Sequence, residues 1–465
     1  RKVERGEAQV VVGARSAIFA PLTHIGAIII DEEHEISYKQ GSSPRYHARE
    51  VAAEMARRYR CPLVLGSATP SAEALDRCRR GMYNGATWTR VEMPERPGHA
   101  VLPEVRIADL RRGFSHGSRS MFSKPLMEGL GRVVERREKA VLLHNRRGFA
   151  PFLMCRECGC VPTCNHCSTA LTYHERTHTV QCHTCGSSWR VQPYPAPTSR
   201  CPKCGSRYLA KMGLGTQQIE DALHQMLPED VAIIRMDADS TRGKDAHKKL
   251  LEQFDAADCA VLLGTQMIAK GLDFPEVTLV GVVNADFALK MPDFRAGERA
   301  YDLLEQVAGR AGRGDCPGEV IIQTYLPEDP VIRAVAEHDR SIFTDYDLDQ
   351  RRDALYPPFV RLVNILVWSA NRDDAQDYVG RIAKLLKRRW HAAASDFLRA
   401  GSSVPQVLGP ASCVIERAKD RYRFHLLVKS PVGYHVSDDI DACLKEVGSV
   451  RGVSVSVDVD AYDLM

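Results

Sequence analysis

The chain has 465 residues, of which 44% are hydrophobic and 26% are charged. This composition is ordinary for a soluble globular protein and excludes the fibrous and disordered classes, while the length predicts two to four domains of about 100 to 200 residues each. The formal charge of +4 does not by itself indicate a nucleic-acid partner, because eight thiolates holding two divalent ions would cancel it.

Location and completeness are also constrained. No uncharged apolar run of about 18 residues occurs and the N-terminus lacks a signal pattern, so we expect a cytoplasmic protein without a membrane span. Thiols stay reduced there, so the fifteen cysteines predict metal binding rather than disulfides. The chain opens on Arg1 and runs almost at once into a strand pattern, which suggests a fragment.

The first 95 residues predict an α/β lobe. Three short apolar runs have the pattern of strands buried on both faces of a parallel sheet, namely AQVVVGA at 8–14, IGAIIID at 25–31 and CPLVLGSAT at 61–69. Between the last two, residues 46–59 carry apolar side chains at helical spacing. Residues 96–130 are rich in Pro, Gly and Ser, which favours a linker.

A second α/β series predicts another lobe, over 131–150 and 213–340. It begins with KAVLLHN at 139–145 and is interrupted by a cysteine-rich insertion at 151–212. After the insertion come a helix, three further strand patterns and GEVIIQTY at 318–325. Residues 345–465 then alternate apolar and polar positions at period two with helices between, which predicts a separate α+β domain.

Polar motifs follow these strands. DEEH at 31–34 comes directly after an apolar strand, where ligands bind in parallel sheets, so Asp31 can hold Mg²⁺ and Glu32 can orient the attacking water. A solvated acidic turn is the alternative for DEEH alone. GSATPS closes the next strand at 66–71, and QVAGRAGRG at 306–314 offers arginines to a phosphate, although a basic glycine turn would look the same.

Four of these segments, in this order, resemble superfamily 2 helicase motifs II, III, V and VI: DEEH, GSATPS, GTQMIAKGLDFPEVTLV and QVAGRAGR. Along essentially the whole chain, GARSAIFAPL, DEEHEISYKQ with PRYHARE, HNRRGFAP, the cysteine block and GLGTQQIE resemble the bacterial replication-restart helicases of the PriA family. The resemblance implies two RecA-like parallel-sheet lobes, the first incomplete, with a zinc-binding insertion in the second and an α+β C-terminal domain.

The resemblance also implies roles for individual residues. Asp31 and Glu32 match the magnesium and water-activating acids, while Gln306, Gly309, Arg310 and Arg313 match motif VI, whose arginines contact ATP phosphates. Motif III corresponds to Ser67, Ala68 and Thr69, which couple nucleotide state to DNA grip. Motif V corresponds to Gly264, Thr265, Gln266, Lys270 and Gly271, and the last is assigned to the nucleotide. Residues 35–49 resemble an aromatic-rich loop that reports bound single strand to the ATPase, with rings and cations at Tyr38, Lys39, Arg45, Tyr46 and His47.

The implied activity is that of an ATP- and Mg²⁺-dependent 3′–5′ DNA helicase, nucleoid-associated, that acts at branched replication forks and seeds replisome reloading. One motif is missing, because no G-x-x-x-x-G-K-[ST] loop occurs in the 465 residues. In the family this loop lies upstream of Arg1, so we expect this polypeptide alone to be inactive. A non-catalytic DNA-structure-binding scaffold of the restart primosome is the alternative.

The cysteine insertion carries four Cys-x-x-Cys pairs, here called hooks: Cys155/Cys158, Cys164/Cys167, Cys182/Cys185 and Cys201/Cys204. Zinc prefers four tetrahedral thiolates, and a hook delivers two from one turn, so eight ligands predict two zinc ions. A thioredoxin-like redox role is the alternative. The hooks can combine in three ways, and the family resemblance implies nesting, with the outer pair of hooks on one ion and the inner pair on the other. Cys160 has no assigned role.

The insertion and the last domain each carry expectations about binding partners. The family implicates the insertion in strand separation and primosome assembly, and a surface brace is the alternative. In the C-terminal domain, Arg417, Lys419, Arg421 and Arg423 alternate with Tyr422 and Phe424, which suits single-stranded DNA or an acidic peptide. The resemblance implies as partners forked and single-stranded DNA, the single-stranded DNA-binding protein, and primosome and helicase-loader proteins.

Overall fold

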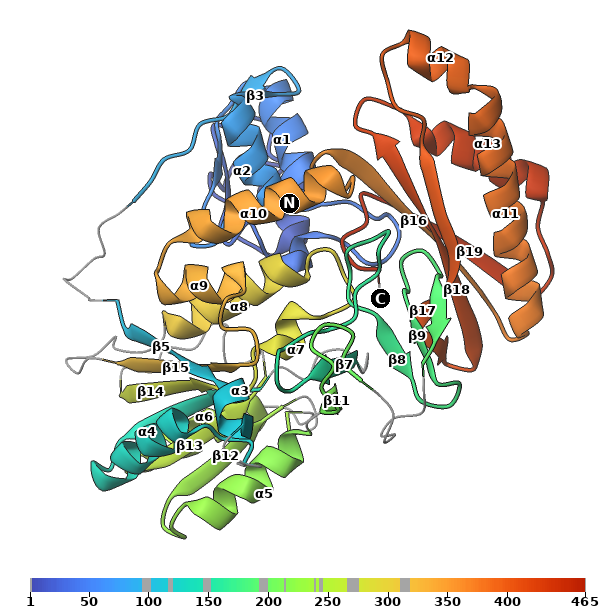
Figure 1. Cartoon of the computed structure of the whole chain (residues 1–465). Helices are drawn as coiled ribbons and strands as arrows, with labels where there is room; N and C mark the ends of the chain where they lie inside the picture. The colour runs from blue at the N-terminus through green and yellow to red at the C-terminus, as the bar shows by residue number, and fades with distance from the viewer. Residues whose placement is uncertain are drawn as a thin grey trace.

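The computed structural model describes residues 2–93, 102–115, 120–144, 152–191, 200–212, 215–237, 240–241, 246–265, 276–309 and 318–464. The chain forms four parts (Figure 1): lobe 1 (residues 2–93), lobe 2 (the described residues of 102–353 outside the zinc module), a zinc module (the described residues of 152–212) and a C-terminal domain from residue 354. Within these ranges, no helix has the length and apolar character needed to span a membrane.

Lobe 1 is built on two parallel strands, β1 (Ile28–Ile30) and β2 (Leu63–Leu65). Helix α1 (Ala48–Tyr59) packs on them, because Ala52 and Ala56 lie on the face that meets Ile28 and Ile30. The remaining elements are α2 (Ala72–Arg80), the hairpin β3 (Met82–Tyr83) and β4 (Ala86–Thr87), and the short 3₁₀ helices η1 (Arg15–Phe19) and η2 (Ile36–Tyr38).

One strand expected in lobe 1 is wrong. Residues 8–14 are irregular, and Val10 and Val12 are 77% and 93% exposed. Their β-branched side chains favour an extended chain, but among the described residues β1 pairs only with β2, and no neighbouring strand offers them a ladder.

Lobe 2 contains a six-stranded parallel sheet in the order β12-β13-β6-β14-β15-β5. Its central strands are buried along their whole length, as their unbroken apolar sequences predict. The strands are β5 (Glu104–Asp109), β6 (Lys139–Leu143), β12 (Ala232–Met236), β13 (Ala260–Gly264), β14 (Val277–Val282) and β15 (Glu319–Thr324).

Helices cover both faces of this sheet. One face packs against α4 (Lys124–Glu135) and α5 (Thr216–Met226) through Leu126 and Ile219. The other face packs against α6 (Ala246–Ala256), α7 (Asp286–Leu289), α8 (Ala296–Ala308) and α9 (Pro330–Ala336). Helix α10 (Arg340–Asp353) packs on α9, so it belongs to lobe 2 although it overlaps the start predicted for the C-terminal domain.

The predicted linker at 96–130 is corrected by the structure. Its described residues form β5, α3 (Leu110–Ser115) and the start of α4. Composition misled because β5 is an edge strand with alternating exposure, so EVRIAD does not have the continuous apolar sequence of a central strand.

The zinc module lies between lobe 2 and the C-terminal domain (Figure 1). Strands β7 (Phe152–Cys155) and β11 (Leu209–Met212) pair and pack on lobe 2 beside Phe287 and Tyr325. Strands β8 (Thr172–His174), β9 (Thr179–Gln181) and β10 (Ser188–Arg190) form a small antiparallel sheet.

The C-terminal domain is a four-stranded antiparallel sheet, β17-β18-β16-β19, with α11 packed on one face, as the α+β prediction expected. Its elements are β16 (Val360–Ser369), α11 (Arg372–Ala392), α12 (Ala394–Arg399), β17 (Gln406–Ala418), β18 (Arg421–Pro431), α13 (Val436–Val447) and β19 (Val453–Val459).

Candidate functional site

The two predicted catalytic acids lie on the turn that ends β1. Asp31 and Glu32 are exposed, and Glu32 adopts a left-handed backbone with φ of 47°. The end of β2 runs beside this turn, because Glu33 N donates to Gly66 O at 3.0 Å. A Cβ on Gly66 would lie 3.4 Å from Asp31 Oδ1, so the glycine keeps space open beside the carboxylate. Both acids therefore face solvent at the carboxyl edge of the sheet.

His34 joins three of the predicted motifs. Its Nδ1 lies 2.7 Å from Ser67 Oγ, and its Nε2 lies 2.9 Å from the side-chain nitrogen of Gln306 on α8. An amide nitrogen only donates, so Nε2 accepts and Nδ1 carries the proton that is donated to Ser67. A ring with its proton on Nδ1 thus satisfies both contacts, and it links the end of β1, the end of β2 and lobe 2.

Glu33, the buried acid of DEEH, fixes the same turn through hydrogen bonds to α1 and to the start of α2. It accepts from Arg49 Nη1 at 2.8 Å and from the backbone nitrogen of Ser71 at 2.5 Å. Ser71 caps α2, and Arg49 lies on α1. A buried charge is stable only when paired, so Glu33 and Arg49 hold the acid turn and the start of α2 in a fixed relation.

Lobe 2 meets this site through polar residues at helical spacing, here called the α8 seam: Arg295, Glu298, Asp302 and Gln306. Successive positions are three or four residues apart, which places them on one face. Arg295 pairs with Glu73 at 2.5 Å, Glu298 accepts from the backbone nitrogen of Ala72 at 2.8 Å, and Asp302 lies beside Thr69. The seam therefore follows residues 67–73 of lobe 1 along the length of the helix.

Arg295 and Glu298 of the seam are buried, and Asp302 is half-buried. Burial alone would raise the pKa of Glu298, but Arg351 and Arg295 lower it to about 2. Burial raises the pKa of Asp302 above its usual range. Arg351 of α10 donates to Glu298 at 2.9 Å, so the network continues to the helix that precedes the C-terminal domain.

The cysteines form two groups of four whose sulfurs lie within 4.8 Å of one another: Cys155, Cys158, Cys201 and Cys204 outside, and Cys164, Cys167, Cys182 and Cys185 inside. This is the nested pairing that the resemblance implied. Cross-hook sulfur separations are 3.6 Å for Cys155–Cys204 and 3.7 Å for Cys164–Cys185, close to the roughly 3.8 Å edge of a zinc–thiolate tetrahedron. Cys160 belongs to neither group of four.

All four hooks have the same backbone turn. In each, the nitrogen four residues after the first cysteine donates to that cysteine's carbonyl, at 2.8 to 2.9 Å. That fourth residue has a left-handed φ, and it is Gly159, Gly186 or Gly205 in three hooks and Ser168 in the other. A hydrogen bond from Cys167 lowers the pKa of Cys182 to about 4, while burial raises the pKa of Cys164 to about 11. Both the geometry and the donor set fit zinc.

The inner zinc group docks on the C-terminal domain. His183 Nδ1 donates to the carbonyl of Ser412 on β17 at 2.8 Å, and a Cβ on Gly186 would lie 2.8 Å from Pro410 O. The hydroxyl of Tyr356 donates to the carbonyl of Cys167. The outer group packs instead beside Leu209 of β11, the strand that joins the module to lobe 2. Each zinc group therefore faces a different neighbour.

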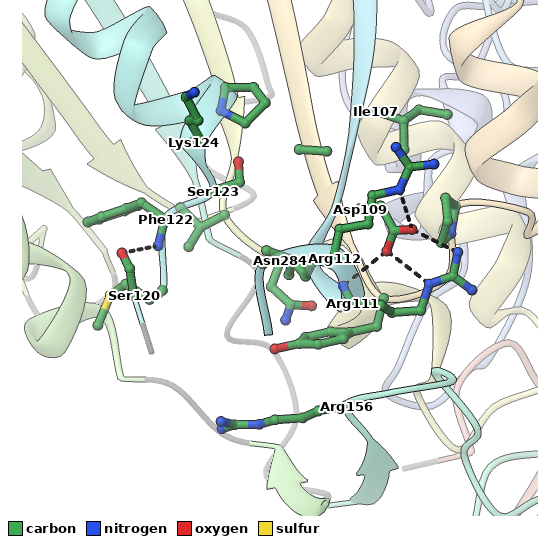
Figure 2. Close-up of a pocket in the computed structure, with 18 of the residues that line it drawn as sticks. Ile107, Asp109, Arg111, Arg112, Ser120, Phe122, Ser123, Lys124, Arg156 and Asn284 are labelled. Carbon is green, nitrogen blue, oxygen red and sulfur yellow. Dashed lines mark hydrogen bonds and ion pairs between the residues drawn. The ribbon is translucent and has the colours of Figure 1, made fainter. Parts of the chain in front are cut away.

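A basic cavity of about 900 Å³ opens where lobe 2 meets the zinc module, beyond the carboxyl ends of β5, β14 and β15. Figure 2 shows Arg156 across the cavity from Asp109 and Arg111. Its charged lining comprises Asp109, Arg111, Arg112, Lys124, Arg156, Lys211 and Glu328. These are five cations and two acids, and Arg111 pairs with both acids, at 2.9 Å to Asp109 and 2.8 Å to Glu328.

Comparison with known proteins agrees with this architecture. Three families match: Primosomal protein N C-terminal domain over residues 352–462, Helicase conserved C-terminal domain over 214–315, and PriA DNA helicase Cys-rich region domain over 164–190. The chain is 43% identical to replication restart protein PriA of Bacillus subtilis, over 100% of the chain and 55% of that protein. Against PriA of Rickettsia conorii it is 32% identical, over 99% of the chain and 67% of the relative.

The chain belongs to the PriA family. It spans a little over half the length of the Bacillus and Synechocystis relatives that it matches, at 55% and 54%. The PriA-family match over 352–462 begins close to the end of α10, which agrees with the observed start of the C-terminal domain.

Several predicted PriA-type site residues lie outside the described residues, namely Gln266, Lys270, Gly271, Arg310 and Arg313. Of the described ones, Asp31, Glu32, Ser67, Thr69 and Gln306 come together at one place, and Gly309 follows directly as the C-cap of α8. Gly264 and Thr265 lie at the end of β13.

The loop residues have partners within the protein. Tyr38 donates to the carbonyl of Asp31 at 2.7 Å, and Tyr46 packs edge-on against Phe19. Lys39 contacts Asp458 of the C-terminal domain at 2.9 Å, with only 7% of its side chain exposed. A nucleic-acid role for Lys39, Arg45 and Tyr46 stays a prediction. His47 is buried and caps α1, which points to a structural role.

Sequence reasoning missed Glu33, Arg49, Glu298, Asp302 and Tyr462. The signal at α8 was available, because polar residues at positions 295, 298, 302 and 306 recur at helical spacing on one face, and the other charged residues of the helix are Arg299 and Glu305. Tyr462 gave no local signal, since its contacts are with Arg49 and Arg295, which are distant in sequence.

Proposed function

We propose that this chain is the motor-core and C-terminal part of an ATP-dependent DNA helicase that restarts replication at stalled or branched forks. One observation carries the proposal: residues of motifs II, III and VI meet at His34, within hydrogen-bond distance of Ser67 and Gln306. A superfamily 2 motor needs these motifs at one nucleotide cleft between its lobes.

In the proposed site, Asp31 would hold Mg²⁺ and Glu32 would orient the attacking water. When bound, ATP would supply the phosphoryl group, and Mg²⁺ would supply positive charge that offsets the negative charge of the phosphates. Glu33 and Arg49 keep the acid turn in place through their buried ion pair of 2.8 Å. Gln306 is connected to Ser67 by two hydrogen bonds through His34, so a shift of α8 would move the end of β2.

Substitution of Glu32 tests the chemistry in the full-length gene product. Glu32→Gln keeps the size of the side chain and removes the carboxylate, so DNA-stimulated ATP turnover should fall at least about 100-fold while nucleotide binding persists. The control is Glu54→Gln on the exposed face of α1, where the carboxylate contacts only Arg57 and Arg58. Equal turnover in the two variants would contradict the assignment.

We further propose that these 465 residues alone hydrolyse ATP only at background rate, because they contain no G-x-x-x-x-G-K-[ST] loop. Measurable DNA-stimulated turnover by this polypeptide would refute that statement. Full-length protein from the same gene is the matched positive control.

DNA would run along the carboxyl edge of both sheets, where the loop at 38–46 and the basic cavity of lobe 2 lie. The direction of movement can be measured from the displacement of an annealed strand on substrates with a single-stranded 3′ or 5′ tail. We expect displacement only on the substrate that requires 3′–5′ movement. Proposed partners are forked and single-stranded DNA, the single-stranded DNA-binding protein, and primosome and loader proteins. The family membership supports these assignments.

A non-catalytic scaffold of the restart primosome is the second candidate, favoured only by the missing phosphate loop. It predicts fork binding without turnover in the full-length protein. The motor predicts turnover that depends on Glu32, so the same assay separates the two.

A further inference from the structure

The loop after the acid turn is held by the C-terminal domain. Lys39 Nζ lies 2.9 Å from Asp458 Oδ1 and donates to the carbonyl of Val459 at 2.7 Å, while Arg45 Nη1 lies 3.9 Å from Asp458 Oδ2. We call the contact of Asp458 with Lys39 and Arg45 the latch. It joins parts of the chain that are more than 400 residues apart.

The alternation of β19 explains why a carboxylate points at the loop. Val453, Val455, Val457 and Val459 pack with the core beneath α11, so Asp458 faces the other side of the strand. Its side chain is 12% exposed and that of Lys39 is 7% exposed. The latch is therefore partly buried and screened by solvent less than a surface ion pair.

The charges at the latch do not balance. Two cations from one loop converge on the two oxygens of a single carboxylate, and the Arg45 contact is long. A phosphate diester carries the same single charge and presents two free oxygens, so it could take the place of Asp458. A groove of about 400 Å³, lined by Ser43, Arg45 and four residues of β19, borders Arg45, the cation whose contact with Asp458 is long.

The loop is connected to the acid pair. Tyr38, next to Lys39, donates to the carbonyl of Asp31 at 2.7 Å. The backbone bridge between Lys39 and His47 closes the loop at its base, so its two cations move with the same short segment. Release of the latch would therefore change the position of the turn that carries Asp31 and Glu32.

We propose that Asp458 occupies the loop cations in the absence of nucleic acid and that a backbone phosphate of single-stranded DNA displaces it. The C-terminal domain is then an internal competitor of DNA for Lys39 and Arg45. This regulation rests on the proposed function, because it assumes that the loop contacts DNA.

The test uses Asp458→Asn in the 465-residue chain with a fluorescent oligothymidylate, followed by anisotropy. Loss of the competing charge should tighten binding by about three- to tenfold, the range expected for one partly exposed ion pair. The matched control is Asp460→Asn, two residues away, which breaks only the 2.8 Å ion pair with Arg361 inside the C-terminal domain. We expect its affinity to stay within about twofold of the parent chain. Asp458→Glu should bind as the parent does.

A second set of variants identifies the cations. Adding Lys39→Ala and Arg45→Ala to Asp458→Asn should abolish the gain. Hydrogen exchange of residues 39–47, measured without DNA, should quicken in Asp458→Asn and not in Asp460→Asn. A single thermal unfolding transition with the midpoint of the parent chain shows that each variant is folded.

The outcomes separate the two proposals. If the parent chain binds DNA and Asp458→Asn binds no tighter than Asp460→Asn, the latch is overturned and the proposed function stands. If Asp458→Asn alone binds, the latch is supported as a strong block. If no variant binds, both the latch and the DNA role of the loop are overturned.

Discussion

His34 connects two side chains, Ser67 and Gln306, through its two ring nitrogens. Because Gln306 donates to Nε2, the proton sits on Nδ1 and points at Ser67, so loss of the Gln306 contact would let the proton move to Nε2 and remove the donor to Ser67. Ser67 Oγ also accepts from the backbone nitrogen of Thr69 at 3.0 Å, so a chain of two hydrogen bonds connects the histidine to the backbone of the segment predicted as motif III.

His34→Ala should therefore uncouple the lobes. Two hydrogen bonds of about 1 kcal/mol each are lost, which corresponds to a fall of roughly 30-fold in DNA-stimulated ATP turnover if both form only in the closed motor. The measurement is the turnover number of full-length protein at saturating DNA. His24→Ala, at an exposed position of the same lobe, is the control. Unchanged stimulation in His34→Ala would show that the contact is structural only.

His47 predicts a pH dependence of stability. Burial, with Arg49 nearby, lowers its pKa to about 3, so the folded state keeps the ring neutral while the unfolded state protonates near pH 6.5. Its stabilising contribution is complete above pH 6.5 and is lost as the pH falls towards 3, at a cost of about 2 kcal/mol at pH 5.

The change to test is His47→Asn, which keeps an acceptor for the Arg49 nitrogen and does not titrate. The thermal midpoint of this variant should fall less than that of the parent between pH 7 and pH 5. His24→Asn should track the parent. Parallel curves for His47→Asn and the parent would contradict the assignment.

At the scale of elements, the sequence predicted what is locally encoded. The lobe 2 strands from KAVLLHN onward were predicted correctly because both faces of the sheet are buried, which gives continuous apolar sequences. The hooks were predicted correctly because two thiols in one turn suit zinc. Strand β17 was missed because Gly409, Pro410 and shifts in its register with β18 break the alternation. Residues 8–14 were predicted as a strand from the same β-branched pattern that identified strands elsewhere. A β-branched run therefore does not form a strand unless another strand is available to pair with it.

The two zinc groups give an elemental prediction. Cys164→Ser and Cys155→Ser should each lower the zinc content from two ions to one per chain. Because His183 and Gly186 touch β17, loss of the inner ion should also speed hydrogen exchange at residues 410–413, whereas loss of the outer ion should affect β7 and β11. Cys160→Ser is the control and should keep both ions. A loss of zinc in that variant would make Cys160 a ligand.

The α8 seam predicts a large stability loss from a single charge. Glu298→Gln leaves Arg351 and Arg295 buried with one partner fewer each, and removal of one partner from a buried network costs about 3 to 5 kcal/mol. Glu337→Gln, in the exposed pair with Arg333, should cost less than about 1 kcal/mol. Urea unfolding measures both. Equal costs would mean that the seam is hydrated.

At the scale of the whole molecule, three parts meet at residues 458–464. Tyr462 lies with its ring 4.0 Å from the Arg295 guanidinium, its hydroxyl 3.4 Å from Arg49 and its carbonyl 2.6 Å from Arg299. Lobe 1, lobe 2 and the C-terminal domain are thus joined through one side chain. Local pattern could not predict this, because it depends on segments that are distant in sequence.

Tyr462→Ala should separate the C-terminal domain from the lobes. Without the ring, Arg295 loses a cation–π contact worth about 1 to 2 kcal/mol when desolvated. Arg49 loses its contact with the Tyr462 hydroxyl. We expect calorimetric unfolding, cooperative across the three parts in the parent, to split into two transitions, with the C-terminal domain and its inner zinc group in one of them.

Two variants sharpen this test. Tyr462→Phe keeps the ring over Arg295 and removes only the 3.4 Å hydroxyl contact, so its unfolding should remain a single transition. Tyr346→Ala removes a half-exposed ring from α10 and controls for loss of an aromatic side chain. If Tyr462→Ala also unfolds in one step, the lobes and the C-terminal domain are held together chiefly by the zinc module, and Cys164→Ser should then produce the split instead.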